Sequence, residues 1–434
     1  MFDVVVVGGG FAGVTAARET SLRGARTLLL EARDRLGGRT WTAPWEGRDI
    51  ELGGGWVHWH QPYTWSEIVR AGLAVEVGEE TEVAAWYVGE ERRTGTIAER
   101  DAIAERGWNA FVAGVEETLP LPHDPLARID RLARLDGMSI ADRMAELDLT
   151  EEERDVLTAE LESLASGPLP ESGAVSVLRW HALSGYSLAL TQYTGGRVTL
   201  VDGTGALLRA IAGGAAFETR LETPVAAISQ SESGVEVHLR AGEAIAARSA
   251  VVALPLNALP AIEFDPPLPA GKCAAIAAGQ ASTGLKIFIR ARGPAVQQNA
   301  IRPGHPFGYL ATEYMLAGGE QVMIGFGIDG RACDVADLSS VQRQLDDIIP
   351  GYEVVAATAN DWLGDEFSLG TWAIHRPGWY TTHHADARRP EGRIAFAGSD
   401  IANGWSGFID GAIESGFRGA ALALDAMTSH RRAA

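Results

Sequence analysis

The sequence predicts an α/β protein built on a parallel sheet, and the two ends of the chain provide the main evidence. The chain opens with the apolar run Val4 to Val7, passes through a glycine-rich turn into the helical segment Val14 to Arg23, and continues with the apolar run Thr27 to Leu30. Two short apolar runs around one helix are typical of a βαβ unit, whose strands run parallel. Near the C-terminus, a strand pattern at 393–397 is followed by a glycine-rich turn and a helix from about Gly411.

Length and composition describe a folded protein of two or three domains, with 434 residues, 46% of them hydrophobic and 22% charged. The net charge of −20 argues against nucleic acid or an anionic membrane as the main partner. The sequence contains neither a signal peptide nor a run of about 18 apolar residues, so we expect a cytoplasmic protein without a membrane partner. Cys273 and Cys333 are the only cysteines, which excludes a disulfide framework, and no histidine lies in the spacing of a metal site.

The middle of the chain alternates between helical and strand-rich segments, which predicts two interleaved domains. Residues 97–166 have a charged helical pattern in which Thr150 and Glu153 form a capping box, whereas the proline-rich residues 119–125 form a loop. Strands are expected at 197–200, 225–228, 235–239, 250–254, 285–289 and 322–325.

The glycine turn after the first strand has the sequence Gly8-x-Gly10-x-x-Gly13, and Glu31 ends the second strand 18 residues later. This context is typical of a dinucleotide-binding site. Gly8 permits the tight turn, Gly10 lets the backbone approach a pyrophosphate, and Gly13 allows the helix to pack closely on the strand. The pyrophosphate is expected at the helix N-terminus, where free N–H groups favour an anion, and Glu31 is expected to accept hydrogen bonds from a ribose.

The residues that follow favour FAD over NAD. Residues 31–40 add a second glycine pair and a cluster of arginines, and residues 53–56 add a further glycine run before Trp56. A large dinucleotide that binds in an extended conformation needs several such places where the backbone can approach it closely.

With these motifs the sequence resembles the flavin-containing, monoamine oxidase-like amine oxidases, in order and over nearly its whole length. The segments around Trp56 and Trp362 resemble those of bacterial nicotine and pseudooxynicotine amine oxidases most closely. The other matching segments are 223–225, 252–255, 283–288, 367–373, 396–400 and 404–412.

The resemblance implies a Rossmann-like FAD-binding domain with an interleaved α+β substrate-binding domain. The first is assembled from residues 1–82, 197–284 and 387–434, and the second from residues 83–196 and 285–386. The residues that the resemblance assigns to FAD binding are Gly8, Gly10, Phe11, Ala12, Gly13, Glu31, Ala32, Arg33, Gly38, Arg39, Gly54, Gly55, Trp56, Val225, Trp362, Gly398, Asp400, Phe408 and Ile409.

The resemblance also implies that Lys286 faces the flavin and that Trp372 and Phe408 form two aromatic walls that orient the amine. Lys286 is one of only two lysines, against 35 arginines. A lysine can hold a water against flavin N5 more readily than the larger, planar arginine fork can. Further candidates for the substrate cavity are Trp59, Trp180, Thr312 and Tyr314.

Three features depart from the family pattern. Thr371 stands where the mitochondrial monoamine oxidases carry the cysteine that binds flavin covalently, so we expect FAD to bind noncovalently. Trp372 and Phe408 replace paired tyrosines, which keeps the aromatic faces but removes the phenolic hydroxyls. Asp400 replaces a glutamate and is one methylene shorter, so its contact with the cofactor is expected to be shifted.

The expected reaction is oxidation of a small amine by hydride transfer to flavin N5, giving an imine that hydrolyses to a carbonyl, with O2 reduced to H2O2. Three alternatives remain open. The first is an L-amino-acid oxidase, in which Arg179 or Arg376 would bind the substrate carboxylate. The second is an amine dehydrogenase with another electron acceptor, and the third is a flavin-binding module without turnover. A homodimer is compatible with the sequence, although no residue specifies one.

Overall fold

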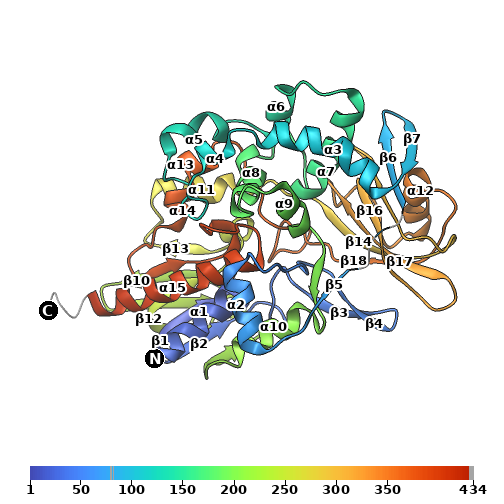
Figure 1. The fold of residues 1–434 in the computed structure, drawn as a ribbon. Helices are drawn as coiled ribbons and strands as arrows, with labels where there is room; N and C mark the ends of the chain where they lie inside the picture. The colour runs from blue at the N-terminus through green and yellow to red at the C-terminus, as the bar shows by residue number, and fades with distance from the viewer. Residues whose placement is uncertain (79–80, 82, 430–434) are drawn as a thin grey trace.

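The computed structural model describes residues 1–78, 81 and 83–429, and its two large sheets lie beneath a layer of helices (Figure 1). The first sheet lies at the lower left of Figure 1, with the long C-terminal helix across it, and the second sheet lies at the right. The described helices include none that is both long and apolar enough to cross a membrane.

The centre of the first sheet consists of five parallel strands in the order β19-β12-β1-β2-β9. Val4 to Val6 in β1 are fully buried, as expected for a parallel strand that is covered on both faces. Three more strands, β11, β10 and β13, extend the sheet beside the first half of β12. The strands are β1 (Phe2–Val7), β2 (Thr27–Leu30), β9 (Glu218–Arg220), β10 (Val225–Ser231), β11 (Gly234–Leu239), β12 (Ala244–Val252), β13 (Glu263–Asp265) and β19 (Ile394–Phe396).

Helices α1 (Phe11–Leu22) and α15 (Ile409–Ser429) pack closely against each other and against this sheet. A Cβ at Gly416 would lie 2.5 Å from Ala12 O, so the two backbones approach to contact distance. Both helices begin slightly earlier than expected. Gly10 is the extended residue that precedes α1, so the helix starts directly after the glycine turn.

The second sheet has seven strands in the order β18-β14-β17-β16-β15-β6-β7, and all neighbours are antiparallel except β15 and β6. One face packs on α12 (Leu338–Ile348), where Ile287 and Leu345 belong to the same buried cluster. Because side chains alternate along a strand, Lys286 and Phe288 point to the opposite face. The strands are β6 (Val83–Val88), β7 (Glu91–Gly95), β14 (Leu285–Arg292), β15 (Gln298–Ile301), β16 (Tyr309–Met315), β17 (Glu320–Gly327) and β18 (Glu353–Ala359).

Helices between residues 97 and 194 form the upper layer in Figure 1. The two longest, α3 (Ile97–Val112) and α7 (Glu151–Ala165), pack against each other. The predicted capping box of Thr150 and Glu153 is confirmed at the start of α7. The other helices of this layer are α4 (Val115–Thr118), α5 (Ile129–Asp136), α6 (Ile140–Ala145), α8 (Ala174–Leu183) and α9 (Leu188–Thr194).

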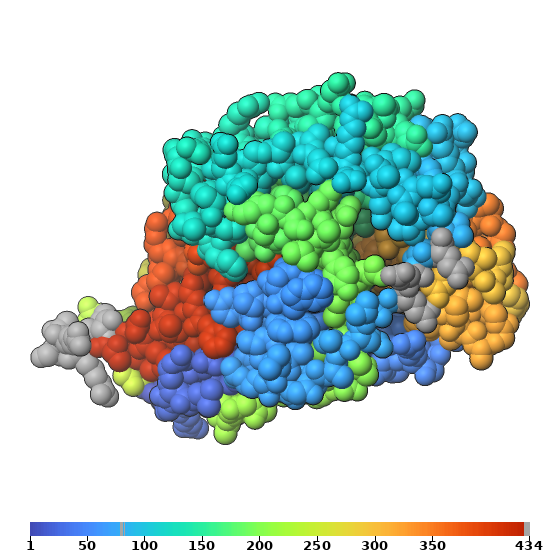
Figure 2. All heavy atoms as spheres, viewed as in Figure 1, coloured from blue at the N-terminus to red at the C-terminus, as the bar shows by residue number. Residues whose placement is uncertain are grey.

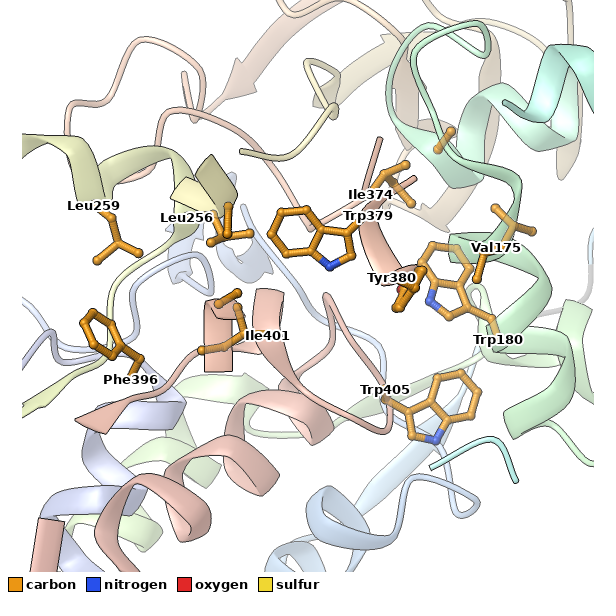
Figure 3. Packing of buried hydrophobic residues seen from close by; sticks show 14 of the residues in the cluster. Val175, Trp180, Leu256, Leu259, Ile374, Trp379, Tyr380, Phe396, Ile401 and Trp405 are labelled. Atoms are coloured by element: carbon orange, nitrogen blue, oxygen red, sulfur yellow. The ribbon is translucent and has the colours of Figure 1, made fainter. Parts of the chain in front are cut away.

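Large aromatic side chains join this layer to the C-terminal part of the chain. Figure 3 shows Trp180 of α8 beside Tyr380, with Trp379 and Trp405 nearby. All four side chains are buried, and Trp405 is fully inaccessible. This core holds the loop that precedes α15 against α8.

The remaining elements are short and surround the sheets. Two strand pairs form small separate sheets, β3 (Thr42–Trp45) with β4 (Arg48–Glu51) and β5 (Val75–Val77) with β8 (Val198–Leu200). The other helices are α2 (Pro62–Ala71), α10 (Gly203–Ala212), η1 (Leu256–Ala261), α11 (Ala270–Ala278), α13 (Trp379–Thr382), α14 (His384–Arg388) and η2 (Ser399–Ile401).

Each predicted strand is found, although some ends differ. The strand expected at 250–254 is the second half of β12, which ends at Val252 because Ala253 to Pro255 leave the sheet and line a cavity. The segment 119–125 contains no helix or strand, as expected.

Sheet membership follows the predicted segments. Strands of the first large sheet come from 1–82, 197–284 and 387–434, and those of the second come from 83–196 and 285–386. The division into two domains stays a prediction, and residue 82 at its first boundary lies outside the described residues.

Candidate active site

A cavity of about 490 Å³ lies between the two sheets. Its lining comes from the carboxyl ends of β1 and β2, the N-terminal turns of α1 and α15, and one face of the second sheet. In Figure 2 the surface is hollowed between the green atoms near residues 188–200 and the light-blue and orange atoms of the second sheet. Ligands of open α/β sheets bind at the carboxyl ends of the strands, so the position of this cavity is that of a binding site.

The glycine turn at one end of the cavity leaves space that no protein atom fills. A Cβ at Gly13 would lie 1.8 Å from Gly8 O, so close packing requires glycine there, as predicted. A Cβ at Gly10 would come no closer than 3.9 Å to the surrounding chain, so packing does not explain this glycine. The first turn of α1 also has no capping side chain and no acidic residue. Free N–H groups beside an open space fit the pyrophosphate of a dinucleotide.

Glu31 lies just beyond β2 and is held by the backbone. Gly9 N donates a hydrogen bond to Glu31 Oε2 at 2.6 Å, and Arg33 N donates to Oε1 at 2.9 Å. The side chain lines the cavity, and each carboxylate oxygen can accept a second hydrogen bond. Glu31 is therefore fixed in position and still able to bind a ribose hydroxyl.

Two arginines of the segment 31–40 connect this end of the cavity to distant loops. Arg33 pairs with Asp365 at 2.5 Å, and Arg39 donates to Thr371 O at 2.7 Å and pairs with Asp400. Burial alone would raise the pKa of Asp400, but the charge and hydrogen bond of Arg39 hold that pKa below its usual value. Asp400 thus fixes Arg39, which itself lines the cavity.

Lys286 lies at the other end of the cavity, on β14. Its Nζ donates a hydrogen bond to Gly53 O at 2.8 Å and lies 5.0 Å from the centre of the Trp56 ring. Burial lowers the pKa of Lys286 to about 8, and the charges of Glu51 and Glu313 offset only part of this shift. An ammonium group has three donors, so Lys286 has N–H groups left for a ligand or a water.

Aromatic side chains surround the space beside this lysine. Trp372 donates its indole N–H to Leu164 O at 2.9 Å, and its ring centre lies 6.2 Å from that of Phe326. Phe408 meets Trp180 edge-on, with ring centres 5.1 Å apart. These contacts fix the orientation of both predicted wall residues.

The structure brings most of the predicted site residues together around this one cavity. The predicted residues that line it are Gly8, Gly10, Phe11, Ala12, Glu31, Ala32, Arg33, Gly38, Arg39, Gly54, Gly55, Trp56, Trp180, Val225, Lys286, Thr312, Tyr314, Trp362, Trp372, Gly398, Phe408 and Ile409.

Three predicted residues do not line the cavity. Gly13 lies beneath the glycine turn, and Asp400 lies behind Arg39. Trp59 is 48% exposed, and its ring contacts that of His58 in a tilted arrangement, with ring centres 3.6 Å apart.

The arginines considered for an L-amino-acid oxidase also lie outside the cavity lining. Arg179 is buried and donates hydrogen bonds to Tyr380 Oη at 2.8 Å and to Gly404 O at 2.8 Å. Arg376 pairs with Glu171 at 2.5 Å and is partly exposed. Neither guanidinium is placed to bind a substrate carboxylate.

Several lining residues were not expected from the sequence, among them Tyr309, Glu313 and Phe326. Phe326 lies directly opposite Lys286 in the β14–β17 ladder and opposite Tyr309 in the β16–β17 ladder. Side chains alternate between the two faces of a strand, so Tyr309 and Phe326 can be assigned to the face that carries Lys286 once the pairing of the strands is known. The sequence alone does not reveal that pairing.

The fold and the position of the cavity are typical of dinucleotide-binding α/β enzymes. Comparison with known proteins identifies the family within this class of enzyme: residues 11–424 match the family model described as flavin containing amine oxidoreductase. The chain belongs to this family.

Similar proteins cover nearly the whole chain. A pseudooxynicotine dehydrogenase of Pseudomonas sp is 37% identical over 423 residues, which cover 96% of this chain and 84% of that protein. An (S)-6-hydroxynicotine oxidase of Paenarthrobacter nicotinovorans is 31% identical over 432 residues, which cover 96% of this chain and 97% of that protein. A solved structure of a putrescine oxidase triple mutant has a TM-score of 0.84 at 22% identity, covers 98% of this chain and 99% of its own, and shows the same fold.

The chain is therefore a flavin-dependent oxidoreductase that acts on amine donors. The predicted fold class, the flavin and the oxidation of amines are confirmed at this level.

Proposed function

We propose that the chain binds FAD noncovalently and oxidises the C–N bond of a small amine. Bound FAD would supply the hydride acceptor for oxidation of the amine at its α-carbon; the imine product would be hydrolysed by water to an aldehyde or ketone, and O2 would take up the two electrons and become H2O2. The observation that carries the proposal is a single cavity with the free N-terminus of α1 at one end and Lys286 among aromatic rings at the other.

Residues of the first sheet would hold the cofactor. The N–H groups beside Gly10 would bind the pyrophosphate, and Glu31 would bind the ribose. The Thr371 hydroxyl lies 2.8 Å from Ser282 Oγ. Because Thr371 offers no thiol for a covalent bond to flavin, we expect the cofactor to bind noncovalently.

The aromatic walls would orient the substrate and exclude water. An amine gives up a hydride only in its neutral form, and an apolar site favours the neutral form by raising the cost of the charge. Trp372 and Phe408 are held by Leu164 and Trp180, so they can position the nitrogen and the α-carbon without moving.

Lys286 would hold a water or a proton near the reacting atoms. Its bond to Gly53 O fixes Nζ, and a pKa of about 8 lets the group change its protonation near neutral pH. A group with a pKa near the working pH is well suited to proton transfer.

Anaerobic reduction of the flavin, followed by absorbance, tests this function. The panel includes nicotine-like N-heterocycles, arylalkylamines, polyamines and amino acids, and air is readmitted at the end. We expect one class of amine to bleach the flavin. A fully loaded protein that no amine bleaches would contradict the proposal.

A dehydrogenase is the second candidate, because one similar protein is named a dehydrogenase and another an oxidase. Readmission of air separates the two. Rapid recovery of the flavin absorbance indicates an oxidase, and slow recovery that an added electron acceptor accelerates indicates a dehydrogenase.

A further inference from the structure

Residues 402–408 connect η2 to α15 and carry Phe408, one of the two predicted aromatic walls of the cavity. Phe408 N donates a hydrogen bond to Trp405 O at 3.2 Å, and the ring centres of these two residues lie 5.2 Å apart. Trp405 itself is fully buried. The position of Phe408 therefore depends on how this loop is held.

Arg179 of α8 holds the loop from one side. Its guanidinium donates hydrogen bonds to two successive backbone carbonyls, Asn403 O and Gly404 O, the second at 2.8 Å. A third bond, also of 2.8 Å, goes to Tyr380 Oη and fixes the guanidinium from behind. Arg179 is only 1% exposed, and hydrogen bonds of a charged group are strong where little water surrounds it.

Glu414 of α15 holds the same two residues from the other side. Asn403 N donates a hydrogen bond to Glu414 Oε1 at 2.9 Å, and Gly404 N donates one to Oε2 at 2.7 Å. A Cβ at Gly404 would lie 2.7 Å from Glu414 Oε2, so the carboxylate can approach the backbone this closely only beside a glycine.

Together, Arg179 and Glu414 bond all four backbone polar groups of residues 403 and 404. The cation binds the carbonyls and the anion binds the N–H groups, so each bond is assisted by charge. Helix α8 belongs to the upper layer and α15 crosses the first sheet (Figure 1), so the two side chains fix the loop to both parts of the molecule.

We propose that Arg179 and Glu414 are positioning residues of the active site: by fixing this part of the loop they set the position of the Phe408 wall. The inference rests on the proposed function, in which Phe408 orients the amine. Neither Arg179 nor Glu414 lines the cavity, so both would act through Phe408. Displacement of a substrate-positioning group by about 1 Å can slow a reaction about 100-fold.

A double-mutant cycle tests this role. The rate constant of flavin reduction is measured by anaerobic stopped flow on flavin-loaded protein with a saturating amine, so a smaller yield of folded protein does not change it. We expect Arg179→Lys, which loses the planar fork, and Glu414→Gln, which loses one acceptor, each to lower the rate constant at least 10-fold. In a Phe408→Ala background the same substitutions should change it less than twofold, because the wall through which they act is absent.

Arg376→Lys and Glu171→Gln are the matched controls, because these two residues form a partly exposed ion pair and do not line the cavity. Their rate constants should stay within twofold in both backgrounds. The positioning role is wrong if the Arg179 and Glu414 variants lower the rate constant by the same factor with and without Phe408, or by less than twofold with it. Glu414→Gln keeps the shape of the side chain and decides the question if Arg179→Lys does not fold.

Crystal structures of the flavin-loaded variants give a readout that needs no turnover. We expect the Phe408 ring to move by about 1 Å from its place beside Trp180, while Trp372 keeps its hydrogen bond to Leu164 O. A Phe408 ring that stays in place in both variants would contradict the inference. If no amine reduces the flavin, the proposed function is wrong, and the crystal structures alone then decide whether these residues position Phe408.

Discussion

Lys286 has a buried ammonium group that bonds one backbone carbonyl, Gly53 O. Replacement of Lys286 by Met keeps much of the side-chain length and removes every N–H donor. We expect the rate constant of flavin reduction or of flavin reoxidation to fall about 100-fold, the usual effect of losing a positioned proton donor. Stopped-flow absorbance measures both steps, and a variant in which neither step slows would contradict the assigned role.

The pKa of about 8 also predicts a pH dependence for this residue. Burial lowers the pKa, so the ammonium loses its proton as the pH rises through about 8, well below the 10.5 of an exposed lysine. The ratio of wild-type to Lys286→Met rate constants should therefore be constant below pH 7 and change between pH 7 and 9. Ionisation of the substrate affects both proteins equally and cancels in the ratio. A ratio that is constant up to pH 10 would exclude titration of Lys286 as the cause.

The roles of single residues could be predicted from the sequence where a short local motif determines them. Gly8, Gly10 and Glu31 follow from one short motif, and their geometry agrees with it. Glu313 could not be predicted, because its direction depends on a bulge in the ladder between β16 and β17, and no local pattern marks the position of that bulge. The position of Asp400 behind Arg39 depends on an ion pair between residues 361 positions apart, which no local pattern reveals.

At the scale of elements, the side chain of Lys272 caps the C-terminal end of the short helix α14. It lies on α11, is 1% exposed, and donates hydrogen bonds to Asp386 O at 2.6 Å, Ala387 O at 3.2 Å and Arg389 O at 2.7 Å, at the end of α14. Replacement by Met would leave these carbonyls without their donor. We expect the free energy of unfolding to fall by about 2–4 kcal/mol.

Urea denaturation measures this change. Lys272 does not line the cavity, so the flavin content of the folded variant should equal that of the wild type, which separates a loss of stability from a loss of the site. A change in unfolding free energy below about 0.5 kcal/mol would show that water replaces the lost hydrogen bonds.

Elements with strong local signals were predicted well. The capping box at Thr150 and the apolar runs of β1 and β2 needed no knowledge of their partners. Strands of the second sheet such as β15 and β16 are short and contain polar or aromatic residues, so their sequence pattern resembles that of a loop. Their pairing supplies the stability that their sequence does not indicate.

At the scale of the whole molecule, the cavity separates the two sheets, and its ligand would contact both. Removal of the flavin should therefore destabilise the entire chain. With the cofactor at 100 to 1,000 times its Kd, we expect the holoprotein to be more stable by about 3–4 kcal/mol. For a chain of this length the difference corresponds to a Tm that is higher by about 3–5 °C.

Differential scanning calorimetry of the apoprotein, with and without added FAD, measures this shift. Riboflavin is the control, because it lacks the pyrophosphate that the N-terminus of α1 would bind. An equal shift with riboflavin would contradict binding through the glycine turn.

The interleaving of the two sheets was visible as an alternation of patterns along the chain, but the shape of the cavity was not. The sequence indicates which segments are strands, whereas the wall of the cavity depends on which strands become neighbours, such as β6 and β15. Pairings between distant segments set that arrangement, and no single segment encodes them.

The burial of both lysines has a practical consequence for chemical labelling. Lys272 and Lys286 are 1% and 7% exposed, and arginine supplies all the other permanent positive side chains. Reagents that acylate lysine would therefore find no exposed lysine side chain on the folded protein. A small acylating reagent that enters the cavity could reach Lys286, and a bound ligand would shield it. The extent of lysine acylation, read by mass spectrometry, would thus report occupancy of the cavity with no background from surface lysines.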